Sequence, residues 1–356
     1  MRKALIIGSN RDSIVKAQCE PFTYSRKQLL RQLDLKVQYI PAQTFSDIAE
    51  VCKQHESEIV FLLPFWREDP LESEQIMKTI REDHPQRKLI FIDPFAQAST
   101  KYFNLLPSVD RLLKRQRYKQ IDDYKKHYIG GSQFTDFVAK KWNYNFEGWY
   151  VGSDVPSGYE DRISCGWSLG TAKRFKDILF QPQFNWFRPA KTLDVFCRLS
   201  LGSETKKEWY YEYRQAAVQA LEPLASDYKI VASGGFVGSS LVPQRQYFQE
   251  LKASRIVFSP YGWGESCWRD FEAICYNCLL VKPSMAHLEV HPNLFIEGET
   301  YVPVAWDFSD LAEKCRYYLD HPQEANRIIK NAHQAYQNYF KNHEFVNMIQ
   351  ELIVDR

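Results

Sequence analysis

Short apolar runs alternate with longer amphipathic segments in the first third of the chain. The apolar runs cover residues 3–8, 36–41, 58–64 and 88–94, and helix-like segments lie between them at 25–33, 46–55 and 72–83. Strands that are apolar throughout and are joined by helices are typical of a parallel sheet covered on both faces. The pattern therefore predicts a doubly wound α/β domain over roughly the first 110 residues.

The same alternation returns in the second half of the chain. It predicts strands at 193–199, 229–232, 255–259 and 278–282, with one more short strand at 294–296. It predicts helices at 208–221, 244–253, 267–276, 309–319 and 322–340. We therefore expect two Rossmann-like domains that face each other across a cleft. In open α/β sheets a ligand lies beyond the carboxyl ends of the strands.

The middle of the chain is less regular. Residues 109–113 could form another strand, and the stretch 111–119 is basic. Residues 142–190 are rich in aromatic residues, glycine and proline, so we expect irregular structure that contains the domain junction. The predicted domains are an acceptor-side domain at 1–185 and a donor-binding domain at 186–340. A carboxy-terminal helix at 341–356 is expected to pack back on the first domain.

Composition narrows the classes of function. The chain has 46 Lys and Arg against 44 Asp and Glu, and this balance argues against a dedicated nucleic-acid binder. No apolar run reaches the roughly 18 residues of a membrane span. The eight cysteines are scattered, and the Cys275–Cys278 pair lacks the second pair of a zinc motif, so reduced core thiols in a cytoplasmic protein are expected.

The segment 255–283 carries the most chemical information. A predicted strand runs into Ser259, a loop with Gly262 and Gly264 follows, and a helix begins near Ser266, which is a suitable N-cap. Glycines ahead of a helix N-terminus allow a ligand to approach the backbone, and the free N–H groups suit a phosphate. The loop is not a full dinucleotide fingerprint, because Cys267 stands where the third glycine would be.

Arg269 and Glu272 are three residues apart and share one face of the predicted helix. A guanidinium can bind a diphosphate through two hydrogen bonds, and a carboxylate can accept hydrogen bonds from ribose hydroxyls. These are the groups that a nucleotide-activated sugar presents. The alternative is an ordinary helical ion pair between Glu265 and Arg269, with Glu272 on a solvated face.

The segment resembles the carboxy-terminal domain of group 1 glycosyltransferases, especially the CgeB-like branch, and it shares an Arg-then-Glu helix with exostosin-like transferases. The resemblance rests on Ser-Pro-Tyr-Gly-Trp-Gly-Glu at 259–265, Arg-Asp-Phe-Glu-Ala at 269–273 and a strand that ends in Lys-Pro at 282–283. It continues through Met-Ala-His-Leu at 285–288, Pro-Asn-Leu-Phe at 292–295, Tyr-Val-Pro-Val at 301–304 and Trp-Asp-Phe-Ser-Asp-Leu at 306–311. It implies the GT-B fold.

The resemblance also implies roles for single residues. Arg269 would hold the diphosphate of the donor, Glu272 its ribose, and Glu265 would lie near the donor sugar as a catalytic group. Many retaining relatives have seven residues between the two glutamates, whereas six separate Glu265 from Glu272. The stereochemical outcome therefore stays open. No metal and no cofactor is expected, because basic side chains and helix N-termini stabilise the leaving nucleotide diphosphate.

Weaker candidates follow other strand ends. They are Asp93 as a catalytic group, Arg198, Gly235 and His287 as donor-binding groups, and the Lys206–Lys207 pair. For each of these a structural role or a solvated turn is the competing interpretation.

The predicted function is metal-independent transfer of a sugar from a nucleotide-diphosphate sugar to a sugar, lipid-linked or protein acceptor. One alternative is an inactive GT-B scaffold that senses nucleotide sugars or serves as an interaction subunit. Another is a different cleft enzyme such as a nucleotide-sugar epimerase. The basic stretch 111–119 could contact an anionic membrane surface, or it could be a solvated helix face.

Overall fold

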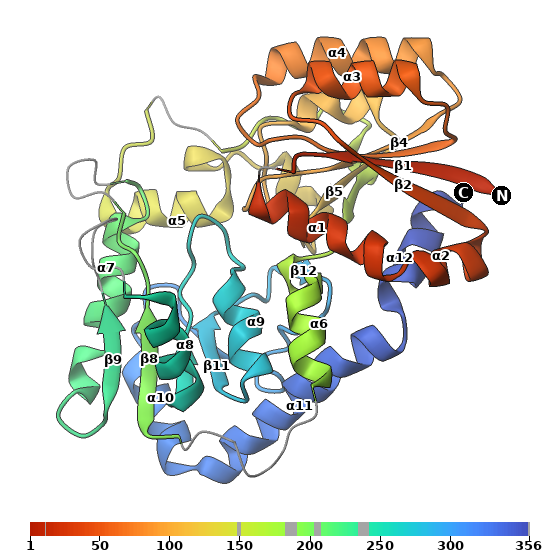
Figure 1. The fold of residues 1–356 in the computed structure, drawn as a ribbon. Helices are drawn as coiled ribbons and strands as arrows, with labels where there is room; N and C mark the ends of the chain where they lie inside the picture. Colours follow the sequence, from red (N-terminus) through yellow and green to blue (C-terminus); the bar gives the residue numbers. More distant parts are fainter. Residues whose placement is uncertain (11, 148–150, 182–190, 203–207, 234–241, 355–356) are drawn as a thin grey trace.

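The computed structural model describes residues 1–356 except 11, 148–150, 182–190, 203–207, 234–241 and 355–356. It contains two parallel sheets, each with helices packed against it, and a small two-stranded sheet between them (Figure 1). The predicted division into two α/β domains therefore corresponds to two separate sheets. The predicted boundary at 185/186 lies outside the described residues.

The amino-terminal sheet has six strands in the order β2-β1-β3-β4-β5-β7, all parallel. Its strands are β1 (Arg2–Gly8), β2 (Leu35–Pro41), β3 (Ile59–Leu63), β4 (Lys88–Ile92), β5 (Arg111–Lys114) and β7 (Ile163–Cys165). The central strand β3 is buried along its whole length, as a strand covered on both faces must be. The sequence pattern predicted the first four strands and suggested β5, but it missed the edge strand β7.

Helices lie on both faces of this sheet, with α3 and α4 on one side and α1, α2 and α12 on the other (Figure 1). Their bounds are α1 (Ser13–Tyr24), α2 (Arg26–Leu33), α3 (Phe45–Gln54), α4 (Pro70–Asp83) and α12 (Glu344–Ile353). Local sequence sets where they begin. Thr44 and Asp47 form a capping box at α3, and Asp69 caps α4, which has Pro70 in its first turn.

The carboxy-terminal sheet has five parallel strands in the order β13-β11-β10-β8-β9. Its strands are β8 (Leu193–Arg198), β9 (Ile230–Ser233), β10 (Ser254–Phe258), β11 (Leu279–Pro283) and β13 (Val302–Val304). Its helices are α7 (Tyr211–Gln219), α8 (Gln244–Ala253), α9 (Trp268–Cys275), α10 (Leu311–Asp320) and α11 (Pro322–Lys341). The prediction of a short strand at 294–296 is wrong, because these residues form no strand and the fifth strand of the sheet is β13.

Both sheets follow one winding rule. In each, the second strand lies outside the first, and the later strands add on the other side of the first. The winding direction therefore reverses between β1 and β3 in one domain and between β8 and β10 in the other. Such switch points leave a crevice at the carboxyl ends of the two strands, where ligands of α/β proteins bind.

A strand pair and two helices are among the connections between the two halves. Strand β6 (Gln116–Tyr118) pairs antiparallel with β12 (Leu288–Val290). Helix α6 (Lys173–Phe180) lies between α1 and α9 (Figure 1). Helix α12 returns to the first domain, where Phe345 packs edge-on against Phe22 and Trp167.

The basic stretch 111–119 forms the strands β5 and β6 and not a helix face. Lys114 and Arg115 are buried, and Arg117 forms an ion pair with Glu289. These three charges are enclosed or neutralised by neighbouring groups, which disfavours a membrane-binding patch at 111–119, and peripheral membrane contact stays a prediction. Among the described residues, no helix is both long and apolar enough to cross a membrane.

Candidate functional site

Arg269 lies at the switch point of the carboxy-terminal sheet. Its Nη1 donates to the backbone oxygen of Arg198, at the end of β8, over 2.6 Å. Its Nε donates to Oγ of Ser259 over 3.2 Å, and Nη2 to the backbone oxygen of Pro260 over 3.4 Å, just beyond β10. The guanidinium therefore lies across the carboxyl ends of the two strands between which the winding reverses.

Arg214, on α7, is a second guanidinium at this place, and sequence reasoning missed it. Its Nη1 donates to the backbone oxygen of Ser200 over 2.5 Å, and its guanidinium stacks on the ring of Tyr210 at 4.2 Å. A Cβ on Gly262 would lie 3.0 Å from its Nη2. Burial and the neighbouring Arg269 lower the pKa of Arg214 to about 10. Within the described residues, neither arginine forms an ion pair with a carboxylate.

The loop between β10 and α9 differs in detail from the prediction. Helix α9 begins at Trp268 with Cys267 as its N-cap, and the Asp270 carboxylate accepts a hydrogen bond from the Cys267 amide over 2.9 Å. Ser266 is therefore not the cap. The Asp270 carboxylate already occupies an N–H group at the start of α9 and offsets the positive end of its dipole. An anion beside the loop would therefore be attracted mainly by Arg214 and Arg269.

The two loop glycines have different neighbours. Gly262 lies next to Arg214, whereas a Cβ on Gly264 would come within van der Waals overlap of the backbone oxygen of Ala96. Ala96 follows β4 in the amino-terminal domain, so Gly264 allows a close contact between the two domains. Gly262 is therefore the loop glycine that leaves space beside the Arg214 guanidinium.

A buried ion pair between Lys282 and Asp270 holds the loop between β10 and α9 in place. Lys282, on β11, donates to Asp270 over 2.9 Å and to the backbone oxygen of Glu265 over 2.8 Å, and both charged side chains are fully buried. Asp270 also accepts from Ser259 over 2.5 Å. The motif residues Asp270 and Lys282 thus fix the loop conformation, which the sequence alone did not reveal.

Glu272 lies on the same helix as Arg269, as predicted, but both its oxygens already have partners. Arg174 on α6 donates to one oxygen over 3.0 Å, and the hydroxyl of Tyr247 on α8 donates to the other over 2.8 Å. The residue is 5% exposed. Burial raises the pKa of Glu272 more than these donors lower it. A ribose would have to share or displace these partners.

Glu265 lies in the contact between the domains and is 1% exposed. Its Oε2 accepts a hydrogen bond from Nε2 of Gln116 over 2.9 Å, and the Gln116 oxygen accepts from Oγ of Ser266. Burial raises the pKa of Glu265, against the lowering effect of the Gln116 hydrogen bond. Gln116 was not anticipated, because it lies in the basic stretch that was expected on a surface.

Asp93 is fully buried and forms an ion pair with Lys114, while Thr100 donates to its other oxygen over 2.7 Å. Lys114 also donates to the backbone oxygen of Ser99 over 2.8 Å. A carboxylate enclosed in this way cannot approach an acceptor. The geometry therefore favours a structural role for Asp93 at the end of β4, and its catalytic role stays a prediction.

The remaining candidates do not converge on one point. Arg198 forms a two-pronged ion pair with Glu250 on α8, at 2.7 and 2.8 Å, so its guanidinium is neutralised. His287 packs against Trp306 with ring centroids 5.0 Å apart, and burial lowers its pKa to about 4. Gly235 and the Lys206–Lys207 pair lie outside the described residues.

A family model matches the carboxy-terminal part of the chain. Residues 211–353, which include Arg214, Arg269 and Glu272, match a family model described as glycosyl transferase-like. No curated protein sequence matches the chain.

Two solved structures resemble the whole fold. The N-terminal domain of Candida albicans trehalose-6-phosphate phosphatase matches with a TM-score of 0.54 and 9% identity, over 99% of this chain and 97% of that one. An alpha-glucosyltransferase in complex with UDP and a 13-mer DNA containing a HMU base matches with a TM-score of 0.50 and 6% identity, over 97% and 99%. Likeness at such low identity concerns the fold alone. The chain has the two-domain GT-B fold, and its residues 211–353 are similar to the glycosyl transferase-like family.

Proposed function

We propose that this protein is a glycosyltransferase that moves a sugar from a nucleotide-diphosphate sugar to an acceptor. We propose a hexose as that sugar, as in the alpha-glucosyltransferase of similar fold. One observation carries the proposal: Arg214 and Arg269 lie together at the switch point of the domain that matches the glycosyl transferase-like model, and neither forms an ion pair with a described carboxylate. Two adjacent guanidiniums that have only neutral acceptors as partners favour a bound dianion.

A nucleotide diphosphate has the chemistry that this site would take. Transfer breaks the bond between the sugar and the terminal phosphate, and negative charge develops on the departing diphosphate. Arg214 and Arg269 would stabilise that charge with fixed donors in a partly water-excluded place. We propose that this replaces a divalent metal at the diphosphate, and that transfer proceeds without added magnesium or manganese.

The acceptor would bind between the domains, where aromatic side chains meet. Trp66 follows β3 and Trp263 lies in the loop after β10, and their ring centroids are 6.0 Å apart. Trp263 is 36% exposed. Indole faces suit the apolar faces of sugar rings, so these two residues support a carbohydrate acceptor or a carbohydrate-bearing lipid or protein. The motif at 259–273 supports membership of the CgeB-like branch.

The test of the donor site is a thermal-shift titration of the purified protein with UDP, GDP, ADP and dTDP. A nucleotide at about 100 times its dissociation constant should stabilise the protein by about 2.7 kcal/mol. We expect one nucleotide to give a shift that Arg269→Ala and Arg214→Ala both abolish. The exposed Arg327 serves as a matched control, and Arg327→Ala should keep the full shift. If the well-folded protein shows no shift with any nucleotide, the donor site is refuted.

A second candidate function is nucleotide-sugar binding without transfer, as a sensor or interaction subunit. The burial of Asp93 and Glu265 favours it, because neither carboxylate is open to an acceptor. The matching nucleotide sugar separates the candidates. Release of free nucleotide diphosphate indicates transfer or hydrolysis, and its absence despite binding indicates the scaffold. Sugar epimers formed without any acceptor would indicate an epimerase instead.

A further inference from the structure

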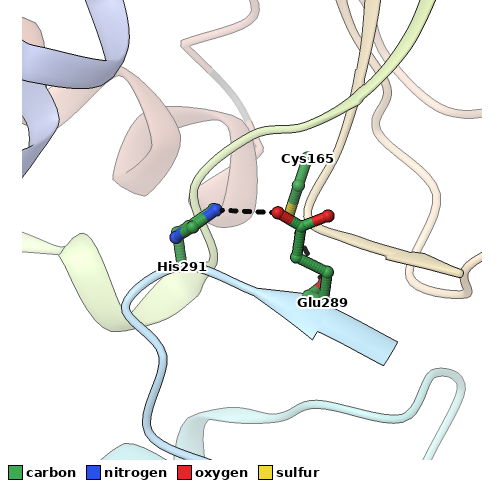
Figure 2. A group of neighbouring side chains, drawn as sticks. All are labelled: Cys165, Glu289 and His291. Atoms are coloured by element: carbon green, nitrogen blue, oxygen red, sulfur yellow. Dashed lines mark hydrogen bonds and ion pairs between the residues drawn. The ribbon is translucent and has the colours of Figure 1, made fainter. Parts of the chain in front are cut away.

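A second cluster of reactive side chains lies away from the donor site. Cys165 ends β7 in the amino-terminal sheet, whereas Glu289 and His291 lie on and just after β12 in the carboxy-terminal half. One donor atom of each lies within 4.8 Å of the other two. Figure 2 shows the three side chains converging, with His291 directed at the Glu289 carboxylate and the Cys165 sulfur beside it.

The types of ligand atom are those that zinc prefers. Thiolate sulfur, imidazole nitrogen and carboxylate oxygen all bind Zn²⁺, with bonds of about 2.0 Å to nitrogen and oxygen and about 2.3 Å to sulfur. Neighbouring donors of a tetrahedral site are then about 3.3 to 3.6 Å apart. The distance between Nε2 of His291 and Oε1 of Glu289 is 3.3 Å. The Cys165 sulfur lies within 4.8 Å of both atoms and would complete three corners of such a tetrahedron on moving closer to them.

The surroundings already orient the carboxylate. Arg117 donates from Nε over 3.0 Å and from Nη2 over 2.7 Å, and both bonds go to Oε2 of Glu289. This leaves Oε1 facing His291. Metal-binding carboxylates are commonly held in this way by a hydrogen bond to the oxygen that does not bind the metal. The backbone oxygen of Glu289 accepts a hydrogen bond from the Cys165 thiol over 3.3 Å, which fixes the sulfur near the same place.

The cluster is open to solvent on one side. All three residues line a cavity of about 820 Å³ between β7, β12 and the last two helices. The side chains of Glu289 and His291 are 35% and 37% exposed, so an ion could enter and water could occupy a fourth position. This place is separate from the arginine pair on the carboxyl ends of β8 and β10.

We propose that Cys165, Glu289 and His291 bind one zinc ion that clamps the amino-terminal sheet to the β6–β12 connection. Binding converts the Cys165 thiol to a thiolate, and its proton passes to solvent. Bonds from zinc to sulfur, nitrogen and oxygen replace the His291–Glu289 hydrogen bond. The role is structural, and one of the three ligands, Cys165, lies outside the residues that match the glycosyl transferase-like model.

The experiment uses the full chain, purified without a polyhistidine tag, stripped with a chelator and dialysed against zinc. Elemental analysis should give one zinc per chain, and zinc should raise the melting temperature. Cys165→Ser, Glu289→Gln and His291→Gln should each lower the affinity for zinc at least 10-fold. Cys267→Ser and His321→Gln, which remove a thiol and an imidazole elsewhere, should keep full zinc content.

Cobalt gives a readout that distinguishes ligation from a change in stability. Co²⁺ bound to the stripped protein should show a thiolate-to-cobalt absorption band that is absent in Cys165→Ser, with folding of each variant checked by circular dichroism. Folded wild-type protein that retains no zinc after dialysis would refute the site. So would a Cys165→Ser variant with an unchanged zinc affinity and an unchanged cobalt spectrum.

Discussion

Gln116 donates a hydrogen bond to Glu265 across the interface between the two domains, over 2.9 Å. The two residues are 149 positions apart in the chain. The bond holds the loop that precedes α9 against the end of the amino-terminal sheet. The conformation of the candidate donor site therefore depends on a residue of the other domain.

Replacing Gln116 by Leu should destabilise the protein. The change leaves the buried Glu265 carboxylate without its side-chain donor, at a cost of about 1–3 kcal/mol. Urea denaturation at neutral pH measures this cost. Gln120→Leu, an exposed change in the segment that follows β6, should stay within about 0.5 kcal/mol of wild type. Equal stability of Gln116→Leu and wild type would mean that the bond contributes nothing.

Stability should fall as pH rises through the titration of Glu265. Burial raises the pKa of Glu265 above its ordinary value of 4.5, so the folded state binds its proton more tightly than the unfolded state does. The stabilising effect of that proton is complete below about pH 4.5 and is lost as pH rises through the folded-state pKa. Glu265→Gln removes this group, and its unfolding free energy should decline less steeply above about pH 4.5. Glu272, whose pKa is also raised, should leave a residual slope.

The titration of His287 should lower stability as pH falls, which is opposite to the effect of Glu265. Burial lowers the pKa of His287 from 6.5 to about 4, so the unfolded state binds its proton first as pH falls. Stability from this group is complete above about pH 6.5 and is lost towards pH 4, by at most about 3 kcal/mol. His287→Phe should lose less stability across this window in denaturation curves. An identical pH profile for variant and wild type would contradict the burial of the imidazole.

Asp93 should matter for folding rather than for chemistry. Asp93→Ala leaves Lys114 charged and buried without its partner, which costs about 3–5 kcal/mol. The double change Asp93→Ala, Lys114→Met should recover most of that loss, as measured by urea denaturation. The exposed pair Asp122–Lys125 gives a control, since Asp122→Ala should leave the urea midpoint nearly unchanged. A stable Asp93→Ala protein that lost only its transfer activity would restore the catalytic role.

Trp263 should bind the acceptor. Trp263→Ala removes a ring contact worth about 0.5–1.5 kcal/mol, so the acceptor KM should rise about 2- to 10-fold while the donor KM stays unchanged. Steady-state kinetics with the donor identified by thermal shift measures both constants. Phe180, exposed on α6, supplies a control, since Phe180→Ala should change neither constant. A rise in the donor KM alone would place Trp263 on the donor side.

The sequence predicted the strands and helices that have a clear local pattern of apolar residues. It missed the short strands and the site residue whose positions depend on partners far away in the chain. Apolar runs revealed β1 to β4 and β8 to β11, and the motif around Arg269 and Glu272 lies where strand order puts a ligand. Strands β6 and β12 are three residues each, so they have too little periodicity to show in the pattern. Arg214 gave no signal, because an arginine in an ordinary polar helix is common. Its proximity to Arg269 depends on how α7 packs against the glycine loop.

The small β6–β12 sheet has a mechanical consequence. Arg117 lies opposite Glu289 in this antiparallel ladder, and the amide of Lys119 donates to the backbone oxygen of His287 over 2.9 Å, so backbone hydrogen bonds join the halves along one line. Separation of the two domains would break this ladder, whereas rotation about it would not. We therefore expect these amides to exchange slowly with deuterated solvent while the Trp66–Trp263 side of the cleft opens and closes. The β6–β12 sheet would then be the rotation axis between the two domains. Donor and acceptor would enter the cleft when one domain rotates about this axis.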